Sequence, residues 1–282
     1  MCAALSALLL LAIGARAAVG QEADDETRTT INKQVTNPVS TTWSLKWQNE
    51  ILSLDRHDGS NRAQYEMQFQ PSLPVLLTPA WKLIVRPEFT LIDNKPFTDA
   101  DGRSSRSTGV GDTILDLALS PVLGPWLLGV GPTFIFPTAN REQTGQGTWQ
   151  VGPGGVFGYQ AKRWLLGLIA QQWFSYAGSS SRKADSELHL QYLASWFLPH
   201  GWSIGTSPII EFDWRASPGQ QVSFPLGLYL AKVERFGALP VKFQVEGLYS
   251  PVRPDSYGQE FGLKLYITPV VPSLVDGPLF GE

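Results

Sequence analysis

Apolar and polar residues alternate with a period of two in twelve segments between residues 43 and 268, and this pattern restricts the fold more than any other feature. In the last segment, for example, Leu263 and Leu265 alternate with Gly262 and Lys264. Successive side chains of a β-strand point to opposite faces, so each segment predicts a strand with one apolar face. The predicted strands are 43–54, 65–74, 80–92, 111–121, 125–137, 148–160, 163–176, 187–198, 201–214, 221–234, 240–250 and 257–268.

The lengths of the predicted strands and of their connections indicate a membrane barrel. Each segment reaches the roughly 9–11 residues that a tilted strand needs to cross a bilayer, and an even strand number is typical of bacterial single-chain barrels. Long polar connections (55–64, 93–110, 138–147, 177–186, 215–220 and 251–256) alternate with mostly short ones (75–79, 122–124, 161–162, 199–200 and 235–239). Long loops at one end and short periplasmic turns at the other are typical of outer-membrane barrels. We therefore predict an all-β, transmembrane, antiparallel up-and-down β-barrel of about 12 strands in the outer membrane of a Gram-negative cell.

Composition excludes several other classes of protein. No stretch after residue 20 approaches the roughly 20 consecutive apolar residues of a membrane helix. Charged residues make up 17% of the chain, below the roughly 25% usual for soluble domains. The net charge of -3 provides no basic surface for nucleic acid, so we expect no nucleic-acid partner.

The N-terminal residues predict an export signal. Residues 3–13 form one apolar run, too short to span a bilayer, and Ala15-Arg16-Ala17 fits a small-x-small cleavage pattern. We predict a signal peptide over residues 1–17, with cleavage as late as residue 20 as a variant and a buried N-terminal helix as the alternative. The only cysteine, Cys2, would be removed with it. We divide the remainder into a polar periplasmic leader (18–42), the outer-membrane β-barrel (43–268) and a C-terminal tail (269–282).

Aromatic residues fall near the ends of the predicted strands, where they would form two girdles at the membrane interfaces; an ordinary aromatic core is the alternative. The girdle candidates are Trp126, Trp149, Trp164, Trp173, Trp196, Trp202, Trp214, Tyr176 and Tyr257. Six prolines inside the predicted strands are unexpected in a closed barrel. A proline has no N–H to donate, so the strand loses one hydrogen bond to its neighbour unless a β-bulge accommodates the proline. The six prolines are Pro71, Pro87, Pro132, Pro153, Pro208 and Pro225.

If the apolar faces contact lipid, the polar faces line the interior of the barrel. The predicted lumen-lining residues, which are the candidates for solute selectivity, are Lys82, Arg86, Glu88, Asp112, Asp116, Glu187, His189, Glu211, Asp213, Lys242, Glu246, Glu260 and Lys264. The same faces carry Lys46, Glu50, Glu66, Gln68 and Gln70. Enclosed charges must pair or stay hydrated, so this face forms either a salt-bridged plug or a polar passage whose charges select solutes. Acidic residues are in excess, which favours a weak preference for cations at most.

Candidate catalytic groups are poorly arranged. Ser195 follows His189 by six residues on the same face, which places them about 20 Å apart at roughly 3.4 Å per residue, too far for a nucleophile–base pair. The glycine-rich stretches at 109–112 and 145–147 precede strands rather than helices, so they do not predict a phosphate site. We predict no enzyme, no cofactor and no metal site. A non-conducting structural barrel, a barrel acyl hydrolase and a soluble ligand-carrying barrel are the alternatives to a pore.

The last predicted strand carries a pattern similar to the C-terminal recognition signal of outer-membrane barrels: a polar residue, a glycine and two alternating apolar residues. These are Glu260, Gly262, Leu265 and Ile267. The predicted partners are therefore outer-membrane lipid, the barrel assembly machinery and an unidentified small solute.

Several short motifs resemble one known family. They are Asn37-Pro38-Val39 and the stretches at 109–112 (GVGD), 129–139 (GVGPTFIFPTA), 149–154 (WQVGPG), 171–178 (QQWFSYAG) and 249–254 (YSPVRP). Together they span nearly all of residues 37–268 and resemble the bacterial outer-membrane barrels grouped with the phenol-degradation meta-pathway transporter-like proteins, often mislabelled neuromedin U. The resemblance implies an outer-membrane β-barrel, passive uptake of small organic or aromatic compounds, and Gly-Pro pairs built into the strands. It implies no catalytic residues.

Overall fold

The computed structural model describes residues 25–55, 61–178, 185–275 and 277–281, so the predicted signal peptide and Cys2 lie outside the described residues. An α-helix covers residues 25–36, and a short 3-10 helix, η1, covers Glu142–Thr144. The strands are β1 (Ser44–Asp55), β2 (Asn61–Thr78), β3 (Trp81–Thr98), β4 (Ser104–Gly109), β5 (Thr113–Pro121), β6 (Trp126–Phe136), β7 (Thr148–Gln160), β8 (Trp164–Gly178), β9 (Ser186–Phe197), β10 (Trp202–Thr206), β11 (Ile209–Asp213), β12 (Val222–Phe236), β13 (Leu239–Val252) and β14 (Gly258–Pro269).

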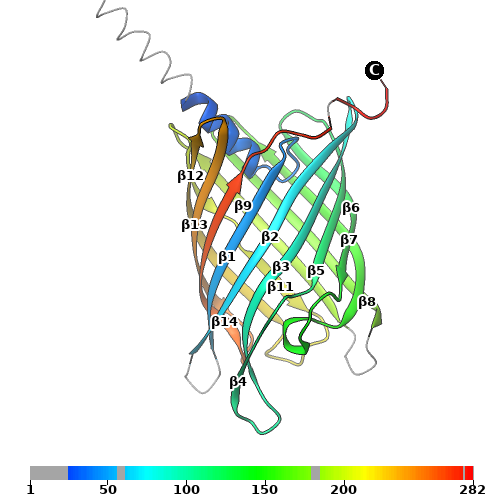
Figure 1. The fold of residues 1–282 in the computed structure, drawn as a ribbon, viewed down its shortest axis with the longest axis vertical. Helices are drawn as coiled ribbons and strands as arrows, with labels where there is room; N and C mark the ends of the chain where they lie inside the picture. Colours follow the sequence, from blue (N-terminus) through cyan, green and yellow to red (C-terminus); the bar gives the residue numbers. More distant parts are fainter. Residues whose placement is uncertain (1–24, 56–60, 179–184, 276, 282) are drawn as a thin grey trace, which may run out of the picture.

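The strands form one closed antiparallel barrel (Figure 1). Closure comes from β1, which pairs with β2 on one side and with β14 on the other. In the described part of the chain, β4 extends the hairpin that begins with β3, and β10 and β11 form one interrupted pass between β9 and β12. The barrel wall therefore has 12 passes, and the predicted fold class is confirmed.

The two ends of the barrel differ as the loop lengths predict. The helix at 25–36 and the C-terminal tail lie at the end of the short turns, and the β3–β4 hairpin extends from the opposite end (Figure 1). Short turns face the periplasm in outer-membrane barrels, so we call these the periplasmic end and the loop end. The tail is attached at the periplasmic end, where the Leu279 and Phe280 N–H groups donate to the carbonyls of Leu76 and Leu77.

The outer surface is apolar, as the alternation predicts. Leu228, for example, is 64% exposed on the outer face of β12. Exposed aromatic residues lie at both ends: Trp126 and Trp196 at the periplasmic end, and Trp149, Tyr176 and Trp214 at the loop end. Such belts fit the two membrane interfaces.

Two predicted girdle residues are exceptions. Trp173 is fully buried inside the barrel, where its Nε1 donates to Thr133 Oγ1 at 3.0 Å. The neighbouring Phe174 points outward, and successive side chains of a strand alternate between its two faces, so Trp173 points into the lumen. Tyr257 lies in a turn with φ of 57° and lines the lumen rather than the interface. Placing these two residues in the girdles was wrong.

Strand pairing breaks at each of the six prolines singled out in the sequence. Pro71 and Pro87 lie in a gap of the β2–β3 ladder, yet each remains paired with its other neighbour, β1 or β5. Pro132 and Pro153 pair with each other across β6 and β7 and lie in gaps of the β5–β6 and β7–β8 ladders. Pro208 separates β10 from β11, and Pro225 lies at a register shift in the β12–β13 ladder. Each proline therefore interrupts pairing locally while the barrel stays closed.

Glycines next to two of these prolines allow the strands to approach closely. A Cβ atom on Gly152 would lie 1.7 Å from the Gln172 carbonyl oxygen, and one on Gly131 would lie 2.0 Å from the Leu117 carbonyl oxygen. No side chain fits at these distances, and the contacted atoms belong to backbone that cannot move aside without opening the ladder. The Gly-Pro pairs are therefore a packing requirement of the wall.

The predicted assembly signal lies on the strand that closes the barrel. Leu265 and Ile267 are exposed on the outer face of β14, whereas a Cβ on Gly262 would meet Leu52 and Leu248 at 3.0 and 3.2 Å. That these residues, with Glu260, are recognised by the barrel assembly machinery stays a prediction.

We expect Gly152→Ala to destabilise the barrel by about 1–3 kcal/mol, because the methyl group must displace the backbone of β8. Gly247→Ala is the matched control, since a Cβ there meets nothing within 4 Å. Urea unfolding in detergent micelles, together with gel migration of unboiled and boiled samples, measures the difference. Equal stability of the two variants would contradict the close approach of β7 and β8.

Candidate functional site

The lumen contains a larger cavity toward the loop end and a smaller one toward the periplasmic end. The larger, which we call the vestibule, has a volume of about 520 Å³, and the smaller, which we call the chamber, has about 140 Å³. The two cavities share the side chains of Lys46, Gln70, Arg86, Ile169, Gln191, Ser207 and Tyr266, which we call the shared ring. Alternate residues of the strands supply this wall, so the polar faces of the sequence meet inside the barrel.

The vestibule wall is rich in carboxylates. Its acidic residues are Glu50, Glu66, Glu88, Asp93, Asp112, Asp116, Glu187 and Glu211, and its Lys and Arg residues are Lys46, Arg86, Lys95 and Lys264. Eight acidic side chains against four Lys and Arg side chains give the wall of this cavity a negative formal charge. A wall of this sign attracts cations to the loop end.

Several of these carboxylates are held by neighbouring side chains of the barrel. Lys264 Nζ lies 3.1 Å from Glu50 Oε1, an ion pair with little exposure on either side. The Asp116 Oδ1 atom accepts hydrogen bonds from Thr133 Oγ1 at 2.5 Å and from Gln171 Nε2 at 2.7 Å. These contacts fix the carboxylates and use part of their capacity to accept hydrogen bonds.

Asp112 holds a loop that folds into the loop end of the lumen. Its Oδ1 accepts from the Ala139 N–H at 3.0 Å and its Oδ2 from the Gln146 N–H at 2.7 Å. The Gln146 side chain then reaches Glu187, donating to both carboxylate oxygens at 3.0 Å. The loop 138–147, which includes η1, thus narrows the vestibule, whereas the β3–β4 hairpin extends away from the barrel (Figure 1).

Most of the predicted lumen residues line one of the two cavities. Arg86, Glu88, Asp112, Asp116, Glu187, His189, Glu211 and Lys264 line the vestibule. Arg86 and Lys242 line the chamber. Glu246 is buried beside the shared ring, where it accepts hydrogen bonds from the Ser207 N–H at 3.0 Å and from its hydroxyl. Lys82 is buried near the periplasmic end of β3 and lines neither cavity.

Asp213 and Glu260 lie outside both cavities. Asp213 is the last residue of β11, and its Oδ1 accepts a hydrogen bond at 2.9 Å from the N–H of Arg215 in the following loop. Glu260 lies at a register shift in the β1–β14 ladder, so Gln259 takes the inward position. The Glu260 carboxylate instead lies 3.2 Å from Arg253 Nη2 at the loop end.

The N-terminal helix docks in the periplasmic mouth of the barrel. Asn32, which is fully buried, donates from Nδ2 to the Gly201 carbonyl at 2.8 Å and to Ser203 Oγ at 3.0 Å. At the end of the helix, Lys242 Nζ donates to Thr36 Oγ1 at 2.7 Å. These contacts could not be predicted from the sequence, because residues 18–42 are polar and indicate only a leader.

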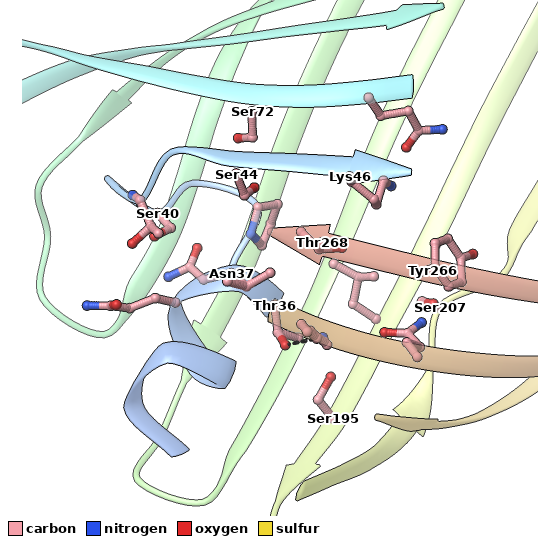
Figure 2. A pocket seen from close by; sticks show the side chains of 18 of the residues that line it. Thr36, Asn37, Ser40, Ser44, Lys46, Ser72, Ser195, Ser207, Tyr266 and Thr268 are labelled. Carbon is pink, nitrogen blue, oxygen red and sulfur yellow. Dashed lines mark hydrogen bonds between the residues drawn. The ribbon is translucent and has the colours of Figure 1, made fainter. Parts of the chain in front are cut away.

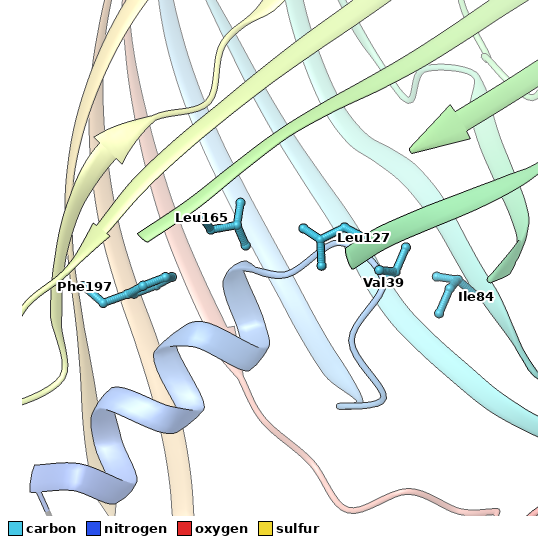
Figure 3. Packing of buried hydrophobic residues seen from close by; sticks show 5 residues of the cluster. All are labelled: Val39, Ile84, Leu127, Leu165 and Phe197. Atoms are coloured by element: carbon cyan, nitrogen blue, oxygen red, sulfur yellow. The ribbon is translucent and has the colours of Figure 1, made fainter. Parts of the chain in front are cut away.

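The chain after the helix crosses the lumen and covers an apolar patch on the inner wall. Val39 belongs to a cluster of buried side chains with Ile84, Leu127, Leu165 and Phe197, which come from four strands. Figure 3 shows Val39 beside Leu127 and Ile84, with Leu165 and Phe197 farther along the inner wall. The signal for this contact was in the sequence, since all four lie on the inward faces of their strands. Apolar residues on an otherwise polar face require a cover, and Val39 supplies it.

The structure does not bring the candidate hydrolase residues together. Ser195 lines the chamber and its hydroxyl is hydrogen-bonded to the Tyr229 hydroxyl. His189 lines the vestibule, 3.9 Å from Glu187 and edge-on to Trp173. In residues 25–55, 61–178, 185–275 and 277–281 no group of three or more His, Cys, Asp or Glu side chains could hold a metal ion. No helix in the described part of the chain is long and apolar enough to cross a membrane.

A sequence profile of the family described as "Putative MetA-pathway of phenol degradation" matches residues 73–208, from β2 to the break between β10 and β11. The resemblance predicted from the motifs is confirmed. The profile covers the central passes of the barrel, a shorter range than the motifs at residues 37–268. No curated protein sequence matches the chain.

A solved structure of an outer membrane channel shares the architecture. The crystal structure of the COG4313 outer membrane channel from Pseudomonas putida F1 superposes with a TM-score of 0.62 at 13% sequence identity, covering 84% of this chain and 98% of that one. A NanC porin structure has a TM-score of 0.47 at 9% identity, covering 82% of this chain and 99% of that one, too low a score to support an argument. The family match and the channel's fold place this barrel in the outer membrane.

The docking of the N-terminal helix should depend on Asn32. We expect Asn32→Ala to weaken it by about 1–3 kcal/mol, because the Gly201 carbonyl and the Ser203 hydroxyl lose their donor inside the barrel. Hydrogen exchange should then show lower protection of the amides in residues 25–36. The control is Thr30→Ala, an exposed position on the same helix. Equal protection in both variants would show that Asn32 does not anchor the helix.

Proposed function

We propose that the protein is a pore for the passive passage of small solutes across the outer membrane, among them small organic compounds. The observation that supports it is the shared ring. A solute that enters the vestibule from the loop end meets the same side chains that line the chamber toward the periplasmic end. The wall along this route is polar, as a hydrated passage requires.

An apolar recess beside the shared ring supports the inclusion of organic solutes. The recess has a volume of about 30 Å³, and its wall includes Pro38, Val39, Ile84 and Ile169 together with the Arg86 side chain. A small apolar group of a solute would leave water there, while the polar groups of the solute stay hydrated in the chamber. The family match favours the same class of compound.

A structural barrel that conducts nothing remains the second candidate, and two observations favour it. The segment from the N-terminal helix to Val39 crosses the periplasmic mouth, and the loop 138–147 folds into the loop end. Both segments narrow the lumen. The chamber beside the N-terminal segment, however, gives the route a volume of about 140 Å³ at its narrower end.

Purified protein in planar lipid bilayers should show discrete channel events. Gln70→Trp should reduce the single-channel conductance several-fold, because the larger side chain enters the shared ring. Leu228→Trp, on the lipid-facing surface, should leave it unchanged and serves as the control. An absence of channel events at every voltage would reject the pore and favour the structural barrel.

A further inference from the structure

The chamber carries charge of one sign. The charged residues in its wall are Lys46, Arg86 and Lys242, and no carboxylate of the described chain lines it. Figure 2 shows Lys46 on β1 with Tyr266 of β14 and Ser207 nearby, above the segment that carries Thr36. The vestibule, in contrast, is rich in carboxylates. The charged side chains that line the narrow part of the route are therefore all cations, and the nearest buried carboxylate, Glu246, lies behind Ser207 and Tyr266.

Two of these cations have unused donors. Lys242 donates to Thr36 Oγ1, but Lys46 and Arg86 make neither an ion pair nor a side-chain hydrogen bond with any residue that the structure describes. Lys46 Nζ lies 5.5 Å from the centre of the Tyr266 ring. Asp116 lies opposite Arg86 in the register of β3 and β5. Its Oδ1 atom, however, accepts hydrogen bonds from side chains of β6 and β8 and not from Arg86. Both cations face the lumen with their donors available.

Arg86 also lies where all three cavities meet, since it lines the vestibule, the chamber and the apolar recess. Ile169 shares this position, and Pro38 lines both the chamber and the recess. A guanidinium next to an apolar surface matches a ligand with a charged end and an apolar end. A planar guanidinium binds a carboxylate through two parallel hydrogen bonds, which also fixes the orientation of the ligand.

We propose that Arg86 and Lys46 form a binding subsite for a small organic monoanion, whose carboxylate contacts both cations and whose apolar or aromatic part lies against Ile169 and Pro38. This inference rests on the proposed pore and names the class of solute that it selects. Glu88, two residues from Arg86 on the same face, lines the vestibule, and Asp116 lines both the vestibule and the recess. Their charges oppose dianions and larger polyanions, so the subsite favours a single negative charge.

Isothermal titration of the detergent-solubilised protein with benzoate tests binding separately from conduction. We expect benzoate to bind, and Arg86→Gln to weaken binding by about 10- to 100-fold, the range for losing a hydrogen-bonded charge. Arg86→Lys keeps the charge without the planar fork and should give an intermediate affinity. Arg103→Gln is the matched control, because Arg103 is 79% exposed in the turn of the β3–β4 hairpin.

Three further probes separate the contributions of charge and ring: acetate has the charge alone, benzyl alcohol the ring alone, and benzylammonium the opposite charge. Each should bind more weakly than benzoate. In planar bilayers, Arg86→Gln should also shift the reversal potential toward cation preference. Conduction without benzoate binding, or with equal binding by wild type and Arg86→Gln, would overturn the subsite and leave the pore. Benzoate binding without conduction would overturn the pore and leave the subsite.

Discussion

The requirement that every backbone N–H and C=O group finds a partner within the protein governs this structure. Hydrocarbon offers no hydrogen bonds, so a sheet in a membrane must have no free edge. The pairing of β1 with β14 satisfies this condition, because it joins the first and last strands of the chain. A closed wall then fixes which residues meet lipid and which meet the lumen, because the side chains of each strand alternate.

The wall meets this requirement although its pairing breaks at the six prolines described above, and the way it does so explains the Gly-Pro pairs. The N–H of a strand residue points toward one neighbouring strand. A proline, which lacks this N–H, therefore interrupts the hydrogen bonds to that neighbour and leaves the pairing with the other neighbour intact. Pro132 of β6 and Pro153 of β7 lie opposite each other. The gap beside Pro132 is in the ladder between β5 and β6, and the gap beside Pro153 is in the ladder between β7 and β8. Gly131 and Gly152 let the next strands approach at these gaps. The breaks are thus local, and the neighbouring ladders carry the closure.

The sequence predicts those features of the fold that depend on residues within one strand, and it does not predict features that depend on contacts between distant parts of the chain. Alternation is local, so the passes, the lipid-facing side and most lumen residues follow from the sequence. Glu260 does not line the cavities because a register shift in the β1–β14 ladder changes which residue points inward. Trp173 points inward, which its position near a strand end does not indicate. The docking of Asn32 on Gly201 joins residues 169 positions apart, and no pattern within a strand encodes it. Asp112 lines the vestibule as predicted, but its hydrogen bonds to the loop 138–147 join separate parts of the chain and could not be predicted from one strand.

The apolar patch on the inner wall decides how the N-terminal segment can act. If that segment left the barrel, Val39 and the side chains that share its buried cluster would be exposed to the water of the lumen. Exposing a buried aliphatic side chain of this size costs about 1.5–3 kcal/mol, before the loss of the Asn32 hydrogen bonds is added. Both contributions hold the segment inside the barrel. In the proposed pore, the route for a solute runs beside this segment, through the chamber that residues 34–42 help to form, and past Lys46 and Arg86.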